Sequence, residues 1–518
     1  TGLAPVLHLG SSRDGLNKFQ IIRQLQEFRH PNECTATLAL LEDLRRCSFE
    51  MDVYVASASI NACRKVSAWH QAVQLFREVT GRSVEANVIL YNGALSACQK
   101  GSEWVGALQL FAEMASSCME RDIITYGAAI SACEADWQLA LQLFREMAVS
   151  GVKATSVVYG ATLNACAKRG VWVLALQLVR EMADRSVEAD VFVYGQALNA
   201  CDKGGEWAVA LQLLREMAGR SVEANVVVYT TVLSACDQGG QWVLALALLR
   251  EMTDACVDRG IMTYVAAVNA CGKDGEWVAA LQLFRSMVDS SVRRDTAIYN
   301  ALISACQTGA ERVRALQLFG EMADFRLERN AVTYGAVVSA CEENWQLALR
   351  LFRDMAGSCV EANVVVCGAA LHACEHGGEW TLALQLLREM ADGRLKWDTI
   401  SCGLAMGSCW RGGQWPRALQ LLSEMGVGSV HRSLSTYHVA VQACDRGEHW
   451  SGALHLLREM LDGRVEVTGT TYALVVRASG NVGYWVLALQ LFAEMAERST
   501  MTYDAAISAC RKDGEWVW

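Results

Sequence analysis

Basic side chains recur at one fixed place in a repeated sequence, and their regular spacing suits a ligand that carries regularly spaced negative charges. The repeat is 35 residues long, and its clearest copy runs from Val191 at position 1 to Asn225 at position 35. Position 13 is Lys or Arg in eight copies: Lys65, Lys100, Lys168, Lys203, Lys273, Arg411, Arg446 and Lys512. These residues are the first candidates for a binding surface.

Three other positions share a helix face with position 13. Positions 2, 5, 9 and 13 fall within roughly 80° of one another on a helical wheel. Position 9 is Asn or Ser in the first nine full repeats. Position 2 is usually apolar: Ile89, Ile124, Val157, Phe192, Val227, Met262, Val332, Val365 and Ile400. The core does not explain this stripe, because the stripe points away from it, whereas a ligand running along stacked repeats does.

The remaining positions predict two helices that must stack. Tyr194, Leu198 and Cys201, at positions 4, 8 and 11, fall on one side of a first helix that Gly204 and Gly205 end. A second helix carries Trp, Ala, Leu, Leu and Met at positions 17, 20, 21, 24 and 27, the spacing of one buried face. Its Arg and Glu residues are expected on a solvated face.

Because neither helix can bury its apolar side alone, the repeats must stack. The sequence therefore predicts an all-α fold, a right-handed α-solenoid superhelix of stacked antiparallel helix pairs, with the first helices on the concave side. The Trp at position 17 is expected in the core.

The copies cover nearly the whole 518-residue chain. Residues 1–17 are expected to be poorly ordered, and 18–518 to form a single solenoid with a degenerate repeat at 18–52, thirteen repeats over 53–499 and a partial repeat at 500–518. Repeats 123–155 and 331–363 lose two residues between Cys and Trp, which is expected to shorten the turn and preserve the helices. Because the chain starts without Met and ends within a repeat, we expect a fragment.

Composition narrows the chemistry. The net charge of −10 argues against a uniformly basic nucleic-acid binder but allows a local basic stripe. Thirteen of the 20 Cys occupy position 11 and are predicted to be buried thiols in a reducing compartment. No Cys-x-x-Cys occurs and the nine His are scattered, so no metal or cofactor is expected. The longest uncharged apolar run, about eight residues, is too short to span a bilayer.

The 35-residue period, Tyr at position 4, the paired helices and second helices such as Ala-Leu-Gln-Leu-Phe-Arg-Glu-Met resemble the pentatricopeptide repeat family over roughly residues 18–518. Tetratricopeptide repeats, the nearest alternative, have a 34-residue period and a Pro near the end of the unit, and this chain shows neither. The resemblance implies an α-solenoid that binds single-stranded RNA in organelles, with one base per repeat.

The resemblance also implies roles for the stripe. The apolar residues at position 2 would sandwich bases, and the basic residues at position 13 would contact phosphates. Positions 5 and 35 would read the base edge: Ser57, Asn87, Asn92, Asp122, Asp190, Asn225, Thr230, Asp295, Asn300, Asn330, Asn363 and Asp398. Three pairs resemble readers of particular bases: Ser57 with Asn87 for adenine, Asn92 with Asp122 for uracil, and Asn300 with Asn330 for a pyrimidine. Position 5 is Gly in six repeats, which predicts weak base discrimination.

Two functions stay open. The first is a non-catalytic, single-stranded RNA-binding protein that acts in organelle RNA processing, stability or editing, in a chloroplast or mitochondrion. The alternative is a protein–protein interaction scaffold that uses the concave helical surface, which the acidic total and the Gly at position 5 favour. We find no catalytic constellation, and neither function involves a membrane or a small-molecule substrate.

Overall fold

The structure, a computed structural model, describes residues 53–513 with gaps at 66–67, 82–85, 118, 359, 393–394, 428–430, 464, 466, 482–483 and 495–499. The expected disordered segment 1–17 and the degenerate repeat 18–52 lie outside these residues, as does the side chain of Lys512. The backbone contacts divide the chain into two units, residues 1–266 and 267–518. The single solenoid over 18–518 stays a prediction.

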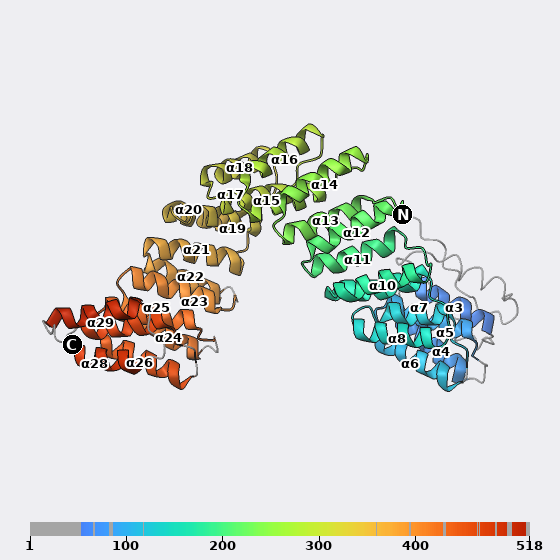
Figure 1. The fold of residues 1–518 in the computed structure, drawn as a ribbon, viewed down its shortest axis with the longest axis horizontal. Coiled ribbons are helices and arrows are strands. Elements are labelled where there is room, and N and C mark those ends of the chain that lie inside the picture. Colours follow the sequence, from blue (N-terminus) through green and yellow to red (C-terminus); the bar gives the residue numbers. More distant parts are fainter. Residues whose placement is uncertain are drawn as a thin grey trace, which may run out of the picture. The chain divides into compact units, whose positions relative to one another are not determined.

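Unit 1 consists, in its described part, of helix pairs stacked side by side (Figure 1). Its first helices are α3 (Val53–Lys65), α5 (Val88–Lys100), α7 (Ile123–Ala132), α9 (Ser156–Arg169), α11 (Val191–Lys203) and α13 (Val226–Gln238). Its second helices are α4 (Trp69–Gly81), α6 (Trp104–Ser116), α8 (Trp137–Val149), α10 (Trp172–Asp184), α12 (Trp207–Gly219) and α14 (Trp242–Asp254). The unit boundary falls within α15 (Ile261–Lys273).

Unit 2 repeats the arrangement. Its first helices are α17 (Thr296–Thr308), α19 (Ala331–Ala340), α21 (Val364–Gly377), α23 (Thr399–Arg411), α25 (Leu434–Arg446), α27 (Gly469–Asn481) and α29 (Thr500–Asp513). Its second helices are α16 (Trp277–Asp289), α18 (Arg312–Asp324), α20 (Trp345–Gly357), α22 (Trp380–Asp392), α24 (Trp415–Val427), α26 (Trp450–Asp462) and α28 (Trp485–Glu494). The described residues contain no strand, and the predicted all-α solenoid of stacked helix pairs is confirmed.

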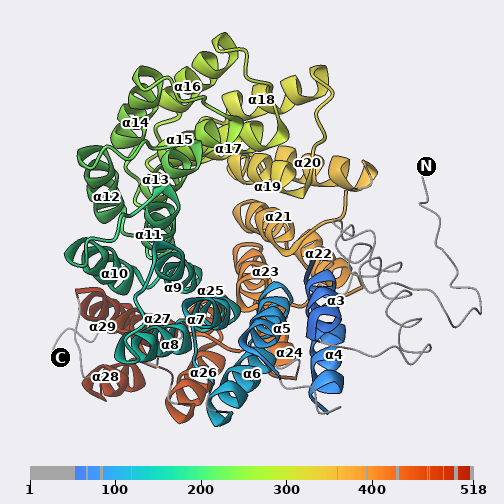
Figure 2. The same ribbon diagram turned by 90° about the vertical axis from the view of Figure 1, so that its right-hand side faces the viewer.

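The first helices pack on one another within each unit. Consecutive first helices, such as α9 and α11 or α21 and α23, approach closely along their lengths, and each also packs on the second helices before and after it. Consecutive second helices make few close backbone approaches. The first helices therefore lie on the inner side of each unit's stack (Figure 2).

The core of each repeat lies between its two helices. Tyr194, Leu198 and Cys201 are fully buried, as predicted. All twelve position-11 Cys whose side chains are described are buried with free thiols. Burial, together with nearby Glu206 and Asp202, raises the pKa of the Cys201 thiol to about 12. These Cys are therefore packing residues, as expected from their positions.

The buried face of the second helix is wider than predicted. Ala210, Leu214 and Met217 are buried, but Leu213 joins them, whereas Leu211 is half-buried. The reason is that each second helix packs on two first helices, its own and the next. Glu216 was expected to be solvated, but it is half-buried because the hydroxyl of Tyr194 donates to its Oε1 atom at 3.5 Å.

The Trp at position 17 packs against the core, as at Trp345 and Trp380, but it is only partly buried and also contacts the next repeat. No Trp is fully buried among the described residues. A Cβ placed on Gly239 would lie 2.3 Å from Trp207 Cδ1, so the indole rests against the end of the next first helix. Trp172 meets Gly204 in the same way, at 2.6 Å. Gly204 therefore provides room for an indole, while Gly205 adopts the positive φ of 73° that ends the helix.

The two 33-residue repeats also differ from expectation. Their first helices, α7 and α19, have 10 residues, whereas α11 has 13. The expected shortened turn is therefore wrong, because the first helix loses three residues while the turn before the second helix has four residues, against three between α11 and α12. The loss also removes the glycine on which the preceding Trp would rest, and Trp104 is accordingly 43% exposed.

We expect Gly239→Ala to lower the free energy of unfolding by about 1–3 kcal/mol, because the added methyl group displaces the Trp207 indole. The control is Gly219→Ala, since a Cβ on Gly219 meets nothing within 4 Å. That substitution is expected to be neutral or to stabilise the helix by up to about 1 kcal/mol. Urea unfolding measures both, and equal effects of the two substitutions would contradict the Trp–Gly contact.

Candidate nucleic-acid interface

One apolar side chain per repeat stands exposed at the start of the first helix. The nine position-2 residues predicted to sandwich bases are 56% (Phe192) to 73% (Val157) exposed, whereas the adjacent Val193 is buried. Tyr54, at position 2 of repeat 53–87, is 77% exposed. The prediction omitted Tyr54, although the repeat register alone identifies it. These side chains do not pack in the core of the repeat, so they are free to contact an apolar group.

The side chains at positions 5 and 35 meet in repeat 88–122. Asn92 Nδ2 donates to the Asp122 carboxylate, at 3.1 Å from Oδ1 and 3.3 Å from Oδ2. A third residue, Thr125 at position 3 of the next repeat, places its hydroxyl 2.7 Å from Asn92 Oδ1 and 2.8 Å from Asp122 Oδ1. The sequence analysis missed Thr125, which fixes the orientation of the Asn92 amide.

This arrangement leaves part of the Asn92 amide for a base. One N–H is used on Asp122 and one oxygen lone pair faces Thr125, so one donor and one acceptor remain. Burial raises the pKa of Asp122, but hydrogen bonds from the Thr125 backbone and hydroxyl and from Asn92 outweigh burial and lower the pKa below its usual value. The carboxylate is therefore ionised at neutral pH.

The same arrangement recurs in repeat 296–330. Asn300 Nδ2 lies 3.4 Å from Asn330 Oδ1, and the Thr333 hydroxyl donates to Asn300 Oδ1 at 2.6 Å. The third predicted pair, Ser57 with Asn87, makes no such hydrogen bond between these two described side chains. The Thr230 hydroxyl is bound within its own helix, donating to the Val226 carbonyl at 2.7 Å.

Position 35 has a second role that the sequence analysis did not assign, since it caps the next first helix. A side-chain oxygen accepts from a backbone N–H at the start of that helix at every predicted base-reading residue of this position: Asn87, Asp122, Asp190, Asn225, Asp295, Asn330, Asn363 and Asp398. The distance is 3.0 Å from Asn225 Oδ1 to the Val228 nitrogen. Capping alone therefore accounts for Asn and Asp here.

Position 5 offers little polarity in the other repeats. The prediction omitted two polar side chains at this position, the exposed Asp504 and His438, whose Nδ1 lies 3.5 Å from the Thr471 hydroxyl. Burial lowers the His438 pKa, which favours its neutral form. A Cβ on Gly195 or Gly368 would meet nothing within 4 Å, whereas one on Gly160 would lie 2.8 Å from the Phe192 ring. Side chains therefore fit at some of these glycines.

Comparison with known proteins decides the family. A model of the pentatricopeptide repeat domain matches residues 109–169, 212–274 and 282–344, and a model of the PPR repeat matches 157–187 and 262–292. The matched segments of this chain are pentatricopeptide repeats. No curated protein matches its sequence significantly.

Solved structures of the pentatricopeptide repeat protein PPR10 share the fold. PPR10 from maize is 18% identical, with 96% of this chain and 76% of that chain covered and a TM-score of 0.71. PPR10 in complex with an 18-nt psaJ RNA element is 18% identical, with 96% and 77% covered and a TM-score of 0.69. At this identity the likeness shows the fold alone.

The basic residues at position 13 of these pentatricopeptide repeats fall into two groups, according to the residue at position 12 of the preceding repeat. Lys100 and Lys203 are exposed and make no ion pair with a carboxylate of the described residues. Lys168 Nζ, by contrast, lies 2.5 Å from Oε1 of Glu134, which occupies position 12 of the preceding repeat. The remaining residues of the stripe with described side chains lie at the same helix position: Lys65, Lys273, Arg411 and Arg446.

Position 12 therefore determines the local charge of the stripe. Arg411 Nε lies 4.0 Å from Glu375 Oε1, again at position 12 of the preceding repeat. Arg446 instead faces an aromatic residue at that position, Trp410, with its guanidinium 6.0 Å from a ring centroid. The sequence signal for this effect is the residue that follows the position-11 Cys, which the prediction did not use.

Thr125→Val is expected to lower the free energy of unfolding by about 1 kcal/mol at pH 7, because it removes the hydroxyl that contacts Asn92 and Asp122. Asp122 has a lowered pKa in the folded state, so its contribution is present above the unfolded pKa of about 3.9 and is lost as pH falls through the folded pKa. The difference between parent and variant should therefore narrow below about pH 4.

Chemical unfolding from pH 7 to pH 3 measures this difference. The control is Thr162→Val, whose buried hydroxyl donates to the backbone carbonyl of Val158 at 2.9 Å and contacts no carboxylate of the described residues. Its cost should not change with pH, and a Thr125→Val cost that is equally flat would contradict the role of Asp122.

Proposed function

We propose that this chain binds single-stranded RNA along the first-helix face of each unit. The observation that carries the proposal is the exposed apolar residue at position 2, once per repeat, beside the polar or small position 5 and the basic position 13. Bases have flat apolar faces and phosphates have regularly spaced charges, so this face matches both. The RNA complex of PPR10, which has the same fold, supports the proposal.

The beginning of unit 1 offers the most favourable surface. Repeats 53–87 and 88–122 carry Lys65 and Lys100 at position 13, with Arg64 and Gln99 rather than acids at position 12. They also carry the exposed Tyr54 and two of the predicted reading pairs. Binding is therefore expected to be strongest and most base-selective over these two repeats.

The role proposed for the chain is non-catalytic. The described position-11 thiols are buried, and burial raises the pKa of thiols such as Cys98 and Cys201, which makes them poor nucleophiles. By family resemblance, the place of action is a chloroplast or mitochondrion and the process is RNA processing, stability or editing. Among the described residues, no helix is long and apolar enough to cross a membrane.

A protein-binding scaffold remains the second candidate, on the strength of one observation. Acidic residues lie within the stripe: Glu134 pairs with Lys168, and Asp445 accepts from Arg477 at 2.5 Å. Such pairs reduce the positive charge that a phosphate would meet. A chain that shows no affinity for mixed single-stranded RNA in a filter-binding assay would favour the scaffold.

Replacing both Lys100 and Lys203 with Ala is expected to flatten the dependence of log affinity on log salt by about 1.4, since each lost phosphate contact contributes about 0.7 on single strands. Base preference should not change, because phosphate contacts do not read sequence. Salt-dependent filter binding measures both quantities.

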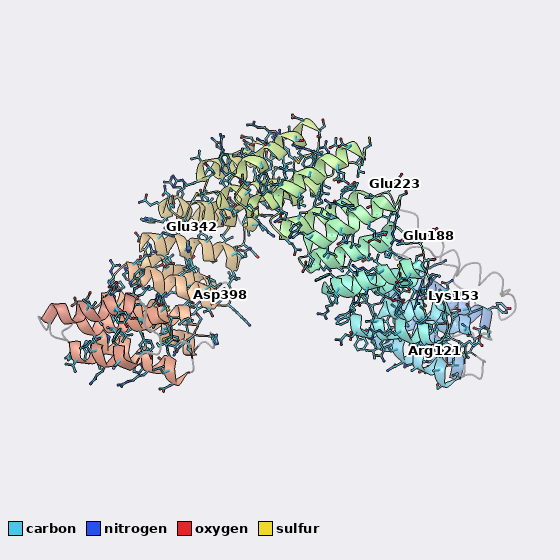
Figure 3. All side chains as sticks on the ribbon, in the orientation of Figure 1. Arg121, Lys153, Glu188, Glu223, Glu342 and Asp398 are labelled. Carbon is cyan, nitrogen blue, oxygen red and sulfur yellow. The ribbon has the colours of Figure 1, made fainter. Side chains whose placement is uncertain are left out.

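The control for this variant is Lys153→Ala. Lys153 is exposed in the loop after α8, on the edge of unit 1 that also carries Glu188 and Glu223 (Figure 3). Lys153→Ala should leave the dependence of log affinity on log salt unchanged. Lys100 and Lys203 also end their helices, where a cation stabilises by about 0.3–1 kcal/mol. A loss of stability with an unchanged slope would mean that they serve the helix alone.

Gly368→Asn is expected to create a uracil preference in repeat 364–398. Asp398 already occupies position 35, and the Ser401 hydroxyl donates to its Oδ1 at 2.5 Å, as Thr125 does at Asp122. The open space at Gly368 admits the new side chain. One added hydrogen bond of about 1 kcal/mol corresponds to a roughly fivefold preference.

Selection from a random RNA library measures this preference as one additional enriched uracil. The matched control is Gly368→Ala, which adds a Cβ without an amide and should leave the selected sequences unchanged. The same enrichment from both substitutions would contradict base reading at position 5.

A further inference from the structure

Two histidines and a glutamate meet between two repeats of unit 2. Glu342 lies in the turn after α19 (Figure 3). His372 and His376 lie one helical turn apart on α21. One ligand atom from each residue lies within 4.8 Å of the others. Two histidines at i and i+4 share one helix face, which is a spacing that holds a single metal ion. The sequence analysis had treated the histidines as scattered.

The closest pair of atoms in this cluster is not a hydrogen bond. Nδ1 of His372 lies 3.1 Å from Oε2 of Glu342. This nitrogen is shielded from solvent and has no hydrogen-bond partner among the described residues. The rings of His372 and His376 meet edge to face, with centroids 4.9 Å apart. A cation between the three side chains would satisfy both the nitrogen and the carboxylate.

Unit 1 contains the same three positions, with Glu again at the first and different side chains at the other two. Glu134 follows the other ten-residue first helix, α7. Asn164 Nδ2 donates to its Oε2 at 3.0 Å, and Lys168 Nζ lies 2.5 Å from its Oε1. The Glu134 carboxylate is therefore neutralised by an ammonium group on the neighbouring helix.

In unit 2 the ammonium group is missing. His372 occupies the position of Asn164, and His376 the position of Lys168. The carboxylate of Glu342 therefore has no counterpart of the Lys168 ammonium group beside it in this cluster. Arg411 lies 4.0 Å from the other acidic residue of α21, Glu375, and is not part of this cluster. The site therefore offers two imidazoles and one carboxylate to a cation.

We propose that Glu342, His372 and His376 bind a zinc ion. Two imidazoles and one carboxylate, with water in the fourth place, form a ligand set that zinc adopts. Bonds of about 2.1 Å place tetrahedral ligand atoms about 3.4 Å apart. The pair at 3.1 Å already fits, and rotation of the exposed His376 side chain closes the rest. The ion stands where the ammonium group of Lys168 stands in repeat 156–190.

Zinc titration of the chelator-treated full chain, followed by calorimetry, tests the site without RNA. The parent is expected to bind one zinc ion more than the double variant His372→Asn, His376→Lys. That variant copies the arrangement of Glu134, Asn164 and Lys168, so it is expected to fold, and circular dichroism checks that it does. Glu342→Gln keeps both imidazoles and is expected to weaken this binding by about tenfold or more.

The matched control is His455→Ala, which removes an exposed histidine of α26 and should leave the zinc stoichiometry unchanged. Magnesium, which prefers oxygen ligands, should not compete. Equal zinc stoichiometry in the parent and the double variant would overturn the proposal. So would full retention of affinity in Glu342→Gln, because the carboxylate would then not be a ligand.

Discussion

In most described repeats the side chain at the last position caps the next first helix, and the stripe of positions 2, 5, 9 and 13 depends on that start. Thr155 and Gly260 are the exceptions, since Thr155 makes no side-chain capping hydrogen bond and Gly260 has no side chain. Asn225 shows the arrangement, with extended backbone angles of −96° and 174° and its Oδ1 atom accepting from Val228. Because the cap fixes which residue is the first in the helix, positions 2, 5, 9 and 13 face the same way in every repeat. Loss of such a cap costs about 1 kcal/mol and frays the turn that carries position 2.

This capping requirement also limits the chemistry at position 35. Asn, Asp, Ser and Thr are the residues that cap well, and Ser433 and Thr468 occupy this position in the later repeats. A capping oxygen is already used, so only the remaining atoms can meet a base. An Asn keeps its amino group, whereas an Asp keeps its second oxygen. The proposed base reading at this position is therefore limited to the few residue types that also cap a helix.

Periodicity predicted the parts of the structure that one helix determines by itself. Tyr194 and Cys201 are buried because their spacing places them on one face, and Phe192 is exposed for the same reason. Contacts between repeats could not be predicted, because the repeat register gives neighbouring positions but not the side-chain geometry. Trp207 on the next repeat's Gly239, and Thr125 on the previous repeat's Asn92, are two such contacts.

For the same reason, the sequence did not reveal the contacts made by Glu134 and Glu342. A loss of two residues looks like a shortened turn in the sequence, but the first helix ends three residues earlier, at Ala132 and at Ala340. The Glu that follows the Cys then lies in a turn, next to positions 9 and 13 of the following helix.

What the acidic site does depends on those two positions. At Glu134 the Asn and Lys side chains pair with the carboxylate. At Glu342 two imidazoles take their places, and they offer nitrogen ligands beside the carboxylate. Both repeats are two residues shorter than the others. The shortened helix leads to an ion pair between Glu134 and Lys168 in one unit and to the proposed metal ligands around Glu342 in the other.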